Sequence, residues 1–232
     1  MMNHIQELLR NGDSFAAIEH IQRQGASLEV ATHYDALVRD LYWKAHDLPA
    51  VVTIGRAGIL YCLGQAIVAE GSSGDAKKLR SFAKGLAYNV SSFTWPGWEE
   101  PGIDPTPDDL ILGRDCAALN LRLAVELNRP PKAMSMAYWL VGAHALTSGD
   151  FDRAEKEFER AHQVLTEPDE IKSLEPCNLG YLAVARLCKT PSDPDAQAQF
   201  DKITADLASR TDEDAKVYLP QLLSARRLYV RS

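Results

Sequence analysis

The chain has 232 residues, of which 46 % are hydrophobic and 25 % are charged, and this composition excludes wholesale disorder, a collagen-like fibre and a low-complexity chain. A formal net charge of −7 opposes binding to nucleic acid and to anionic membranes, because both carry negative charge. No apolar run approaches the roughly 18 residues of a membrane span, and the start MMNHIQELLR has no basic segment leading into an apolar core. We therefore expect no transmembrane helix and no secretory signal.

The cysteines lie far apart in the sequence, and none of them forms a Cys-x-x-Cys motif (Cys62, Cys116, Cys177 and Cys188). Scattered thiols without a secretory signal are typical of reduced, buried cysteines in a cytoplasmic protein. A zinc site would need clustered ligands, and the histidines are not paired at i,i+4 spacing. We expect a cytoplasmic location, no metal and no cofactor.

Apolar residues recur at three- and four-residue spacing along the chain, which predicts helices throughout. Short breaks divide the pattern, each resembling a helix cap beside Gly, Asp, Ser or Pro; they lie at 11–13, 47–49, 71–74, 129–131, 148–150 and 190–195. Weak signals for helical hairpins precede residue 90. The first is a turn at 11–15 followed by a helix that carries Ala17 and Ile21. The second is a helix that carries Val38 and Tyr42, followed by a second helix from Pro49. The third is a helix from about Asp75 that carries Gly85 and Tyr88.

A long loop at 93–109, with the sequence FTWPGWEEPGIDPTPDD, interrupts this pattern. It contains Trp95 and Trp98, four prolines and five acidic residues, and loops of this length are usually functional or disordered. One interpretation is a surface lid whose tryptophans cover the end of a helix pair. The other is an acidic, aromatic element that contacts a partner, since exposed Trp is a common hot-spot residue.

The clearest unit is MAYWLVGAHALTSGDFDRAEKEFERAHQVL, at 136–165. Gly142 on its first helix would let the second helix approach closely. Ala154, Phe158 and Ala161 are spaced four and three residues apart, so they share the facing side of that second helix. On the opposite side we expect solvated i,i+4 pairs, one of them between Asp152 and Lys156.

Two weaker signals follow that unit. Gly180 is preceded by Leu179 as Gly142 is by Val141, and Phe200 is the expected counterpart of Phe158. A final helix at 212–232 opens with acidic residues and closes with arginines, which suits the helix dipole of a polar cap, with Pro220 starting its second half or kinking it.

The unit at 136–168 resembles a tetratricopeptide repeat, in which an aromatic residue, Leu-Gly and Ala on the first helix precede Ala, Phe and Ala on the second. It departs from that pattern at Val141, where Leu is usual, and at Pro168, which comes about two residues late. The resemblance implies an all-α, right-handed superhelical solenoid of about five antiparallel hairpins plus the C-terminal cap, in one domain covering 1–232.

In such repeats the first helices line a groove that binds partners. By this resemblance the groove residues are Met136, Trp139, Ala143 and Leu146 in the clearest unit, and His33, Ala36, Asp40 and Trp43 in the hairpin of Tyr42. Alternatively, these side chains pack against neighbouring repeats. An apolar groove suits an amphipathic helix or an extended apolar peptide.

The sequence contains no Walker loop, no Gly-x-Gly-x-x-Gly and no His-Glu-x-x-His motif, so we expect no enzymatic activity. The function that follows is a protein- or peptide-binding adaptor or scaffold. The first alternative is a regulatory or chaperone-like subunit of a permanent complex. The second is an enzyme or small-molecule sensor with a site near Trp95 and Trp98. Self-association as a homodimer is also open.

Overall fold

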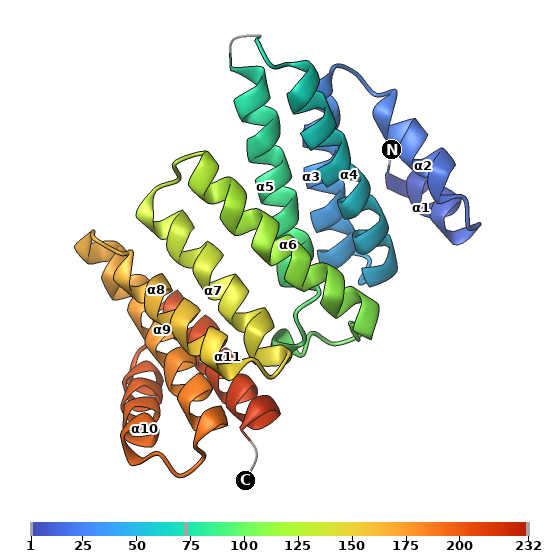
Figure 1. Ribbon diagram of the computed structural model, residues 1–232. Coiled ribbons are helices and arrows are strands. Elements are labelled where there is room, and N and C mark those ends of the chain that lie inside the picture. Colours follow the sequence, from blue (N-terminus) through green and yellow to red (C-terminus); the bar gives the residue numbers. More distant parts are fainter. Residues whose placement is uncertain (1, 72–73, 231–232) are drawn as a thin grey trace. The chain divides into compact units, whose positions relative to one another are not determined.

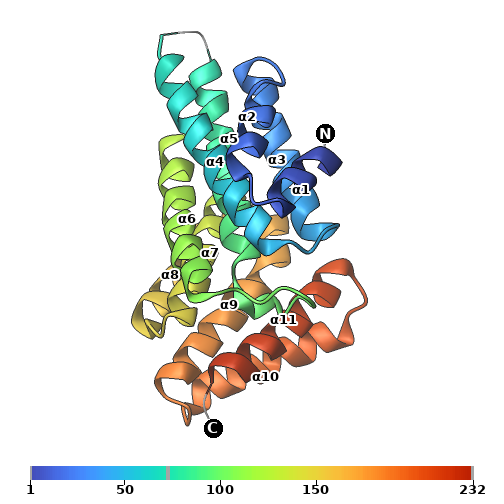
Figure 2. The ribbon, with the colours of Figure 1, turned by 90° about the vertical axis from the view of Figure 1, so that its right-hand side faces the viewer.

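The computed structural model describes residues 2–71 and 74–230, and within these ranges it is all-α, as predicted (Figures 1 and 2). The described residues form eleven α-helices and one short 3-10 helix. Their bounds are α1 Met2–Arg10, α2 Ser14–Gln22, α3 Ser27–Trp43, α4 Leu48–Val68, α5 Asp75–Phe93, η1 Pro96–Trp98, α6 Pro107–Glu126, α7 Pro131–Thr147, α8 Phe151–Gln163, α9 Pro168–Lys189, α10 Pro194–Ser209 and α11 Glu213–Tyr229.

Five of these helices begin after an aspartate whose carboxylate accepts a backbone N–H of the first turn, at 2.9–3.2 Å (Asp13, Asp47, Asp150, Asp193 and Asp212). A side-chain acceptor at this position satisfies a donor that the helix itself leaves unpaired. The predicted breaks at 11–13, 47–49, 129–131, 148–150 and 190–195 are confirmed. In the predicted break at 71–74, residues 72–73 lie outside the described residues.

The start of α3 was not predicted. α3 begins at Ser27, and the Glu29 carboxylate accepts the N–H of Ala26 at 2.9 Å, just after Gly25 with φ +142°. Ala at the cap position gives no sequence signal, because the capping group comes from three residues further on.

Residue contacts group the chain into two compact units. The first comprises Met1–Thr94 and Pro101–Asn128, and the second comprises Trp95–Glu100 and Arg129–Ser232. The expectation of a single domain stays a prediction.

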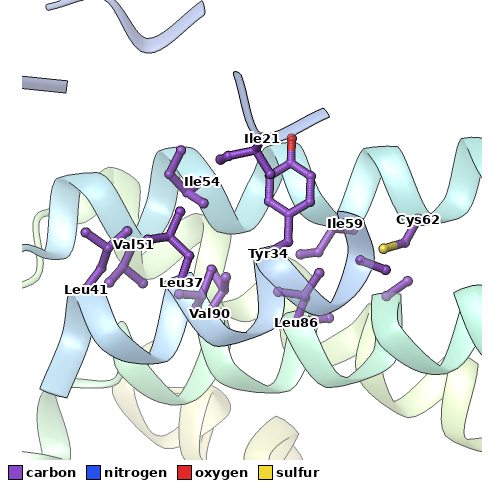
Figure 3. Packing of buried hydrophobic residues seen from close by; sticks show 14 of the residues in the cluster. Ile21, Tyr34, Leu37, Leu41, Val51, Ile54, Ile59, Cys62, Leu86 and Val90 are labelled. Carbon is purple, nitrogen blue, oxygen red and sulfur yellow. The ribbon is translucent and has the colours of Figure 1, made fainter. Parts of the chain in front are cut away.

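The core of the first unit lies where α3, α4 and α5 pack together (Figure 3). Val51, Ile54 and Ile59 of α4 point into this core, which also holds Tyr34 of α3. A Cβ built on Gly58 of α4 would lie 2.8 Å from the Tyr34 ring, so glycine is what lets these helices approach. Among the described residues α4 is the one helix long and apolar enough to cross a membrane, a test that a core helix also passes.

In the second unit α7 and α8 form the predicted close pair. A Cβ on Gly142 would lie 2.8 Å from the Phe158 ring, and Ala154, Phe158 and Ala161 are fully buried. The prediction of an i,i+4 ion pair between Asp152 and Lys156 is wrong, because Asp152 pairs with Lys189 of α9.

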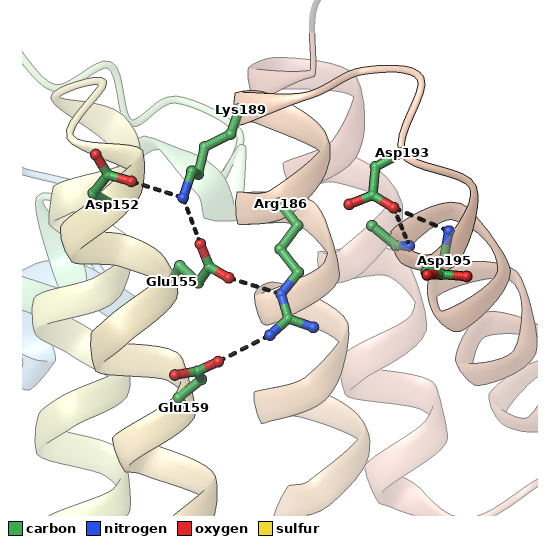
Figure 4. Close-up of polar contacts among 8 residues, drawn as sticks. Asp152, Glu155, Glu159, Arg186, Lys189, Asp193 and Asp195 are labelled. Carbon is green, nitrogen blue, oxygen red and sulfur yellow. Dashed lines mark hydrogen bonds and ion pairs between the residues drawn. The ribbon is translucent and has the colours of Figure 1, made fainter.

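The acidic side of α8 faces α9 instead, and its carboxylates pair across to that helix (Figure 4). Lys189 lies 2.7 Å from both Asp152 and Glu155, and Arg186 lies 2.9 Å from both Glu155 and Glu159. These ion pairs link α8 to α9. The charge pattern of α8 alone does not predict them, because their cations lie on another helix.

The C-terminal helix α11 packs on α9. A Cβ on Gly180 would lie 2.6 Å from Leu222, so the close neighbour of Gly180 is on α11, whereas the sequence pattern pointed to Phe200. Phe200 is buried on α10. α11 continues through Pro220 as one helix.

Candidate partner-binding surfaces

The predicted groove residues of α3 lie on a side of the helix that the first unit leaves open, which we call the α3 face (His33, Ala36, Asp40 and Trp43). Their spacing of three and four residues aligns them along the helix. Ala36 and Trp43 are exposed, while His33 and Asp40 are half-buried. The α3 face is therefore accessible within its own unit.

Trp43 is the outstanding residue of this face, because its side chain is 60 % exposed yet held in place. Its ring meets Tyr42 edge-on with centroids 4.8 Å apart, and meets Phe93 of α5 edge-on at 5.8 Å. Tyr42 and Phe93 in turn stack at 3.9 Å. Edge-to-face contacts of this kind orient the indole. Phe93 was not a predicted site residue, and its position at the start of the long loop gave no signal for this contact.

The charges beside the α3 face are paired locally. Asp40 lies 2.8 Å from Lys44, and Asp35 lies 2.8 Å from Arg39 and accepts a hydrogen bond from Asn89 of α5 at 3.3 Å. Exposed pairs of this kind contribute little to stability. Since they neutralise the carboxylates, Trp43 is the dominant feature of the face.

The predicted groove residues of α7 are placed differently, since Trp139 is 7 % exposed and Leu146 is 1 % exposed. Ala143 is fully buried, and only Met136 is half-buried. The alternative of packing within the fold holds for Trp139 and Leu146 in this structure. Both side chains are buried within the second unit, and their role in binding a partner stays a prediction.

An aromatic cluster, formed by Trp95, Trp98, Trp139, Phe158 and Tyr181, covers this side of α7. The Trp139 ring stacks on Trp98 with centroids 5.6 Å apart and meets Trp95 and Tyr181 edge-on at 5.4 and 5.2 Å. The loop tryptophans thus fill the place that the resemblance gave to a ligand. Tyr181 was not a predicted site residue, and the one sequence signal near it is Gly180, directly before it.

Trp95 is anchored through its indole N–H. It is 1 % exposed, and its Nε1 donates to the carbonyl oxygen of Ala143 at 3.1 Å and to the hydroxyl of Thr147 at 3.0 Å. The Thr147 hydroxyl also lies 2.9 Å from that of Tyr229. Burial raises the pKa of Tyr229 from 10.0 to about 12. Trp95 behaves as the lid interpretation expects.

The loop is also held from outside, by α11. The Ser224 hydroxyl lies 3.2 Å from the carbonyl oxygen of Gly97 and contacts the Glu99 carboxylate, which also pairs with Arg227. The hydrogen bond from Ser224, followed by the charge of Arg227, lowers the pKa of Glu99. Trp98, which lies between Gly97 and Glu99 in the sequence, is half-buried. The sequence pattern relates the arginines of α11 to the helix dipole alone and does not predict that Arg227 pairs with Glu99.

The cysteine side chains lie in surroundings that disfavour the thiolate. Burial raises the pKa of Cys62 and of Cys116 to about 12 and that of Cys188 to about 11. Since the thiolate is the reactive form, these are inert thiols at neutral pH. Within residues 2–71 and 74–230 no group of three or more His, Cys, Asp or Glu side chains could hold a metal ion.

A comparison with models of protein families finds no match for the chain, and a comparison with curated proteins finds none either.

Proposed function

We propose that the protein is a non-enzymatic adaptor or scaffold that binds a protein or peptide through the α3 face. The proposed architecture is a tetratricopeptide-like, right-handed solenoid. Two observations support it: the described helices divide into five successive pairs followed by α11, and Gly142 contacts Phe158 as the repeat pattern requires. A cytoplasmic location, with neither nucleic acid nor membrane as partner, completes the proposal.

The exposed and oriented indole of Trp43 carries this proposal. A tryptophan held by Tyr42 and Phe93 loses little conformational entropy on binding, and Trp is enriched among the residues that dominate interface energies. Ala36, about two turns away from Trp43 on the same face, is small, which leaves room for an apolar side chain of a peptide. An amphipathic helix or extended apolar segment fits this surface.

The test is affinity capture from a lysate of the source organism, with Trp43→Ala compared with the wild type. A protein that binds through Trp43 is expected to be captured at least tenfold less by the variant, because a hot-spot Trp contributes about 2 kcal/mol or more. Phe15→Ala is the matched control, since Phe15 is an aromatic residue 85 % exposed on α2 of the same unit.

Unchanged capture by Trp43→Ala contradicts the assignment of the α3 face. If the same proteins are instead lost on changes across several exposed surfaces, a subunit of a permanent complex is the better description. Far-ultraviolet circular dichroism confirms that each variant is folded before capture is compared.

The aromatic cluster supports a second candidate, a small-molecule site near Trp95 and Trp98. Trp139 Nε1 and the Tyr181 hydroxyl are buried and make no hydrogen bond to the described residues. Burying such groups unpaired costs about 1–3 kcal/mol each, which a polar ligand or a water molecule would recover. A metabolite that raises the melting temperature of the wild type but not of Tyr181→Phe would support this candidate.

A further inference from the structure

Helix α4 has two apolar sides, of which the fold uses one. Val51, Ile54, Ile59 and Cys62 point into the core of the first unit (Figure 3). On the other side Leu60 is 63 % exposed, and Ile67 is 65 % exposed. A helix that needed only its own core would carry polar residues there.

The exposed residues of this side form a narrow seam at alternating spacings of four and three residues. The α4 seam consists of Arg56, Leu60, Leu63 and Ile67, ending at Glu70 just beyond the helix. Within the helix this spacing lines up Arg56, Leu60, Leu63 and Ile67 in one stripe, as in helices that pair along their length. Leu63 is half-buried, and Val68, at 79 % exposed, widens the apolar area.

Gly64 lies beside the middle of the seam. A Cβ built there would meet nothing within 4 Å, so no contact inside the chain explains the glycine. Glycine weakens an exposed helix and permits another backbone to approach closely.

We propose that a second copy of this chain docks on the α4 seam, with the two α4 helices antiparallel about a two-fold axis near Leu63. Reversing the seam on itself places Leu60 against Ile67 of the partner subunit and Arg56 against Glu70 of the partner subunit. The seam is therefore complementary to itself in both shape and charge, which is the requirement for an isologous interface.

The opposite charges at the two ends of the α4 seam favour a second copy of the chain as its partner. Arg56 and Glu70 are 14 residues apart in the sequence, about 20 Å along a helix, so they cannot pair within one chain. Glu70 lies 2.8 Å from Arg80, yet its side chain remains 60 % exposed and within reach of a second cation. A membrane surface would leave the Glu70 carboxylate facing anionic lipid.

The dimer is expected to be reversible, because one helix pair buries less than the roughly 1,600 Å² of a standard interface. It does not depend on the proposed function, since the α3 face and the α4 seam are on different helices. The apolar centre supplies the attraction, and the two Arg–Glu pairs set the antiparallel register.

Charge reversal gives a sharp test by sedimentation or light scattering of the full chain. The wild type is expected to approach twice the 25.6 kDa chain mass as its concentration rises. Arg56→Glu alone and Glu70→Arg alone should each stay at the single-chain mass, since every end would then hold like charges. Mixing the two variants should restore the doubled mass, because both ends of the mixed dimer hold opposite charges.

Two further variants complete the design. Leu60→Asp should remain folded, since the side chain is exposed, and should stay at the single-chain mass even when mixed with either variant. Arg153→Glu, a charge reversal at an exposed position on α8 of the second unit, should dimerise as the wild type does.

The proposal is overturned by a single-chain mass of the wild type up to its solubility limit. It is equally overturned by a dimer that survives both charge reversals, or by a mixture that stays at the single-chain mass. Binding of the wild type to anionic vesicles, lost on Leu60→Asp without any change of mass in solution, would assign the seam to a membrane instead.

Discussion

At Gly142 the missing side chain sets the separation of α7 and α8. The Phe158 ring occupies the space where a Cβ would lie, at 2.8 Å, and Phe158 is fully buried, so its ring has little room to retreat. Glycine destabilises a helix interior, but at this position it allows the Phe158 ring to pack directly on the backbone of α7.

We predict that Gly142→Ala destabilises the protein by about 1–3 kcal/mol, since overpacking a filled core has this cost. Gly85→Ala is the control, because Gly85 also lies within a helix but has nothing within 4 Å of the built Cβ. That variant should gain up to about 1 kcal/mol from helix propensity. Urea unfolding of both variants measures the difference, and equal effects of the same sign would contradict the assignment of Gly142.

Two tryptophans with opposite surroundings give a second residue-scale prediction. Trp95→Phe should cost about 1–3 kcal/mol, because it removes the hydrogen bonds to Ala143 and Thr147 and leaves a cavity. Trp43→Phe should change the free energy of unfolding by less than about 0.5 kcal/mol, since that side chain is 60 % exposed. A large loss of stability on Trp43→Phe, or no loss on Trp95→Phe, would contradict the exposure described for Trp43 or the burial described for Trp95.

Among the elements, α11 depends on charge at its first turn. The Asp212 carboxylate accepts hydrogen bonds from Arg210 at 2.8 Å and from the N–H of Ala215 at 3.1 Å. Arg210 is the larger cause, the N–H of Ala215 is the next, and together they lower the pKa of Asp212 from 3.8 to about 2.

We predict an acid-dependent contribution of Asp212 to stability. Because the folded pKa is the lower one, the stabilisation is complete above the unfolded value of 3.8 and is lost as the pH falls through about 2. Asp212→Asn keeps a capping side chain but cannot titrate. The difference in melting temperature between wild type and variant should therefore be constant above about pH 5 and shrink between about pH 4 and pH 2.

Arg210→Met provides the matched control for Asp212. It removes the largest cause of the lowered pKa while leaving the cap in place, so acid should act on this variant at a higher pH than on the wild type. A melting-temperature difference between wild type and Asp212→Asn that stays equal from pH 7 to pH 2 would refute this account.

At the scale of the whole molecule, the reactivity of the cysteine thiols measures how often the folded protein unfolds. Cys62, Cys116 and Cys177 are buried and unpaired, and Cys188 is partly buried. Burial raises the pKa of all of them, so the reactive thiolate is scarce in the folded protein.

We predict that a thiol reagent modifies the native protein slowly and all four cysteines at once in denaturant. The rate in native buffer should follow the free energy of unfolding, so Gly142→Ala should react faster than Gly85→Ala. Rapid reaction of more than the partly buried Cys188 in the native protein would contradict the burial described for the other cysteines.

Much of the local structure follows from the sequence alone. The positions of Asp47 and Asp150 predict helix starts, and the spacing of Ala154, Phe158 and Ala161 predicts the buried side of α8. These features are decided by backbone groups and side chains within a few residues of one another, so a single segment contains the information.

Only the tertiary structure decided which helix each surface meets. It paired the carboxylates of α8 with α9, placed Leu222 against Gly180, and filled the expected ligand side of α7 with Trp95 and Trp98. Helical period fixes which residues share a side, but many neighbours satisfy the same apolar stripe, and the choice among them rests on contacts between segments far apart in the chain. For the same reason, Trp43 and Trp139 look equivalent in sequence and differ completely in exposure.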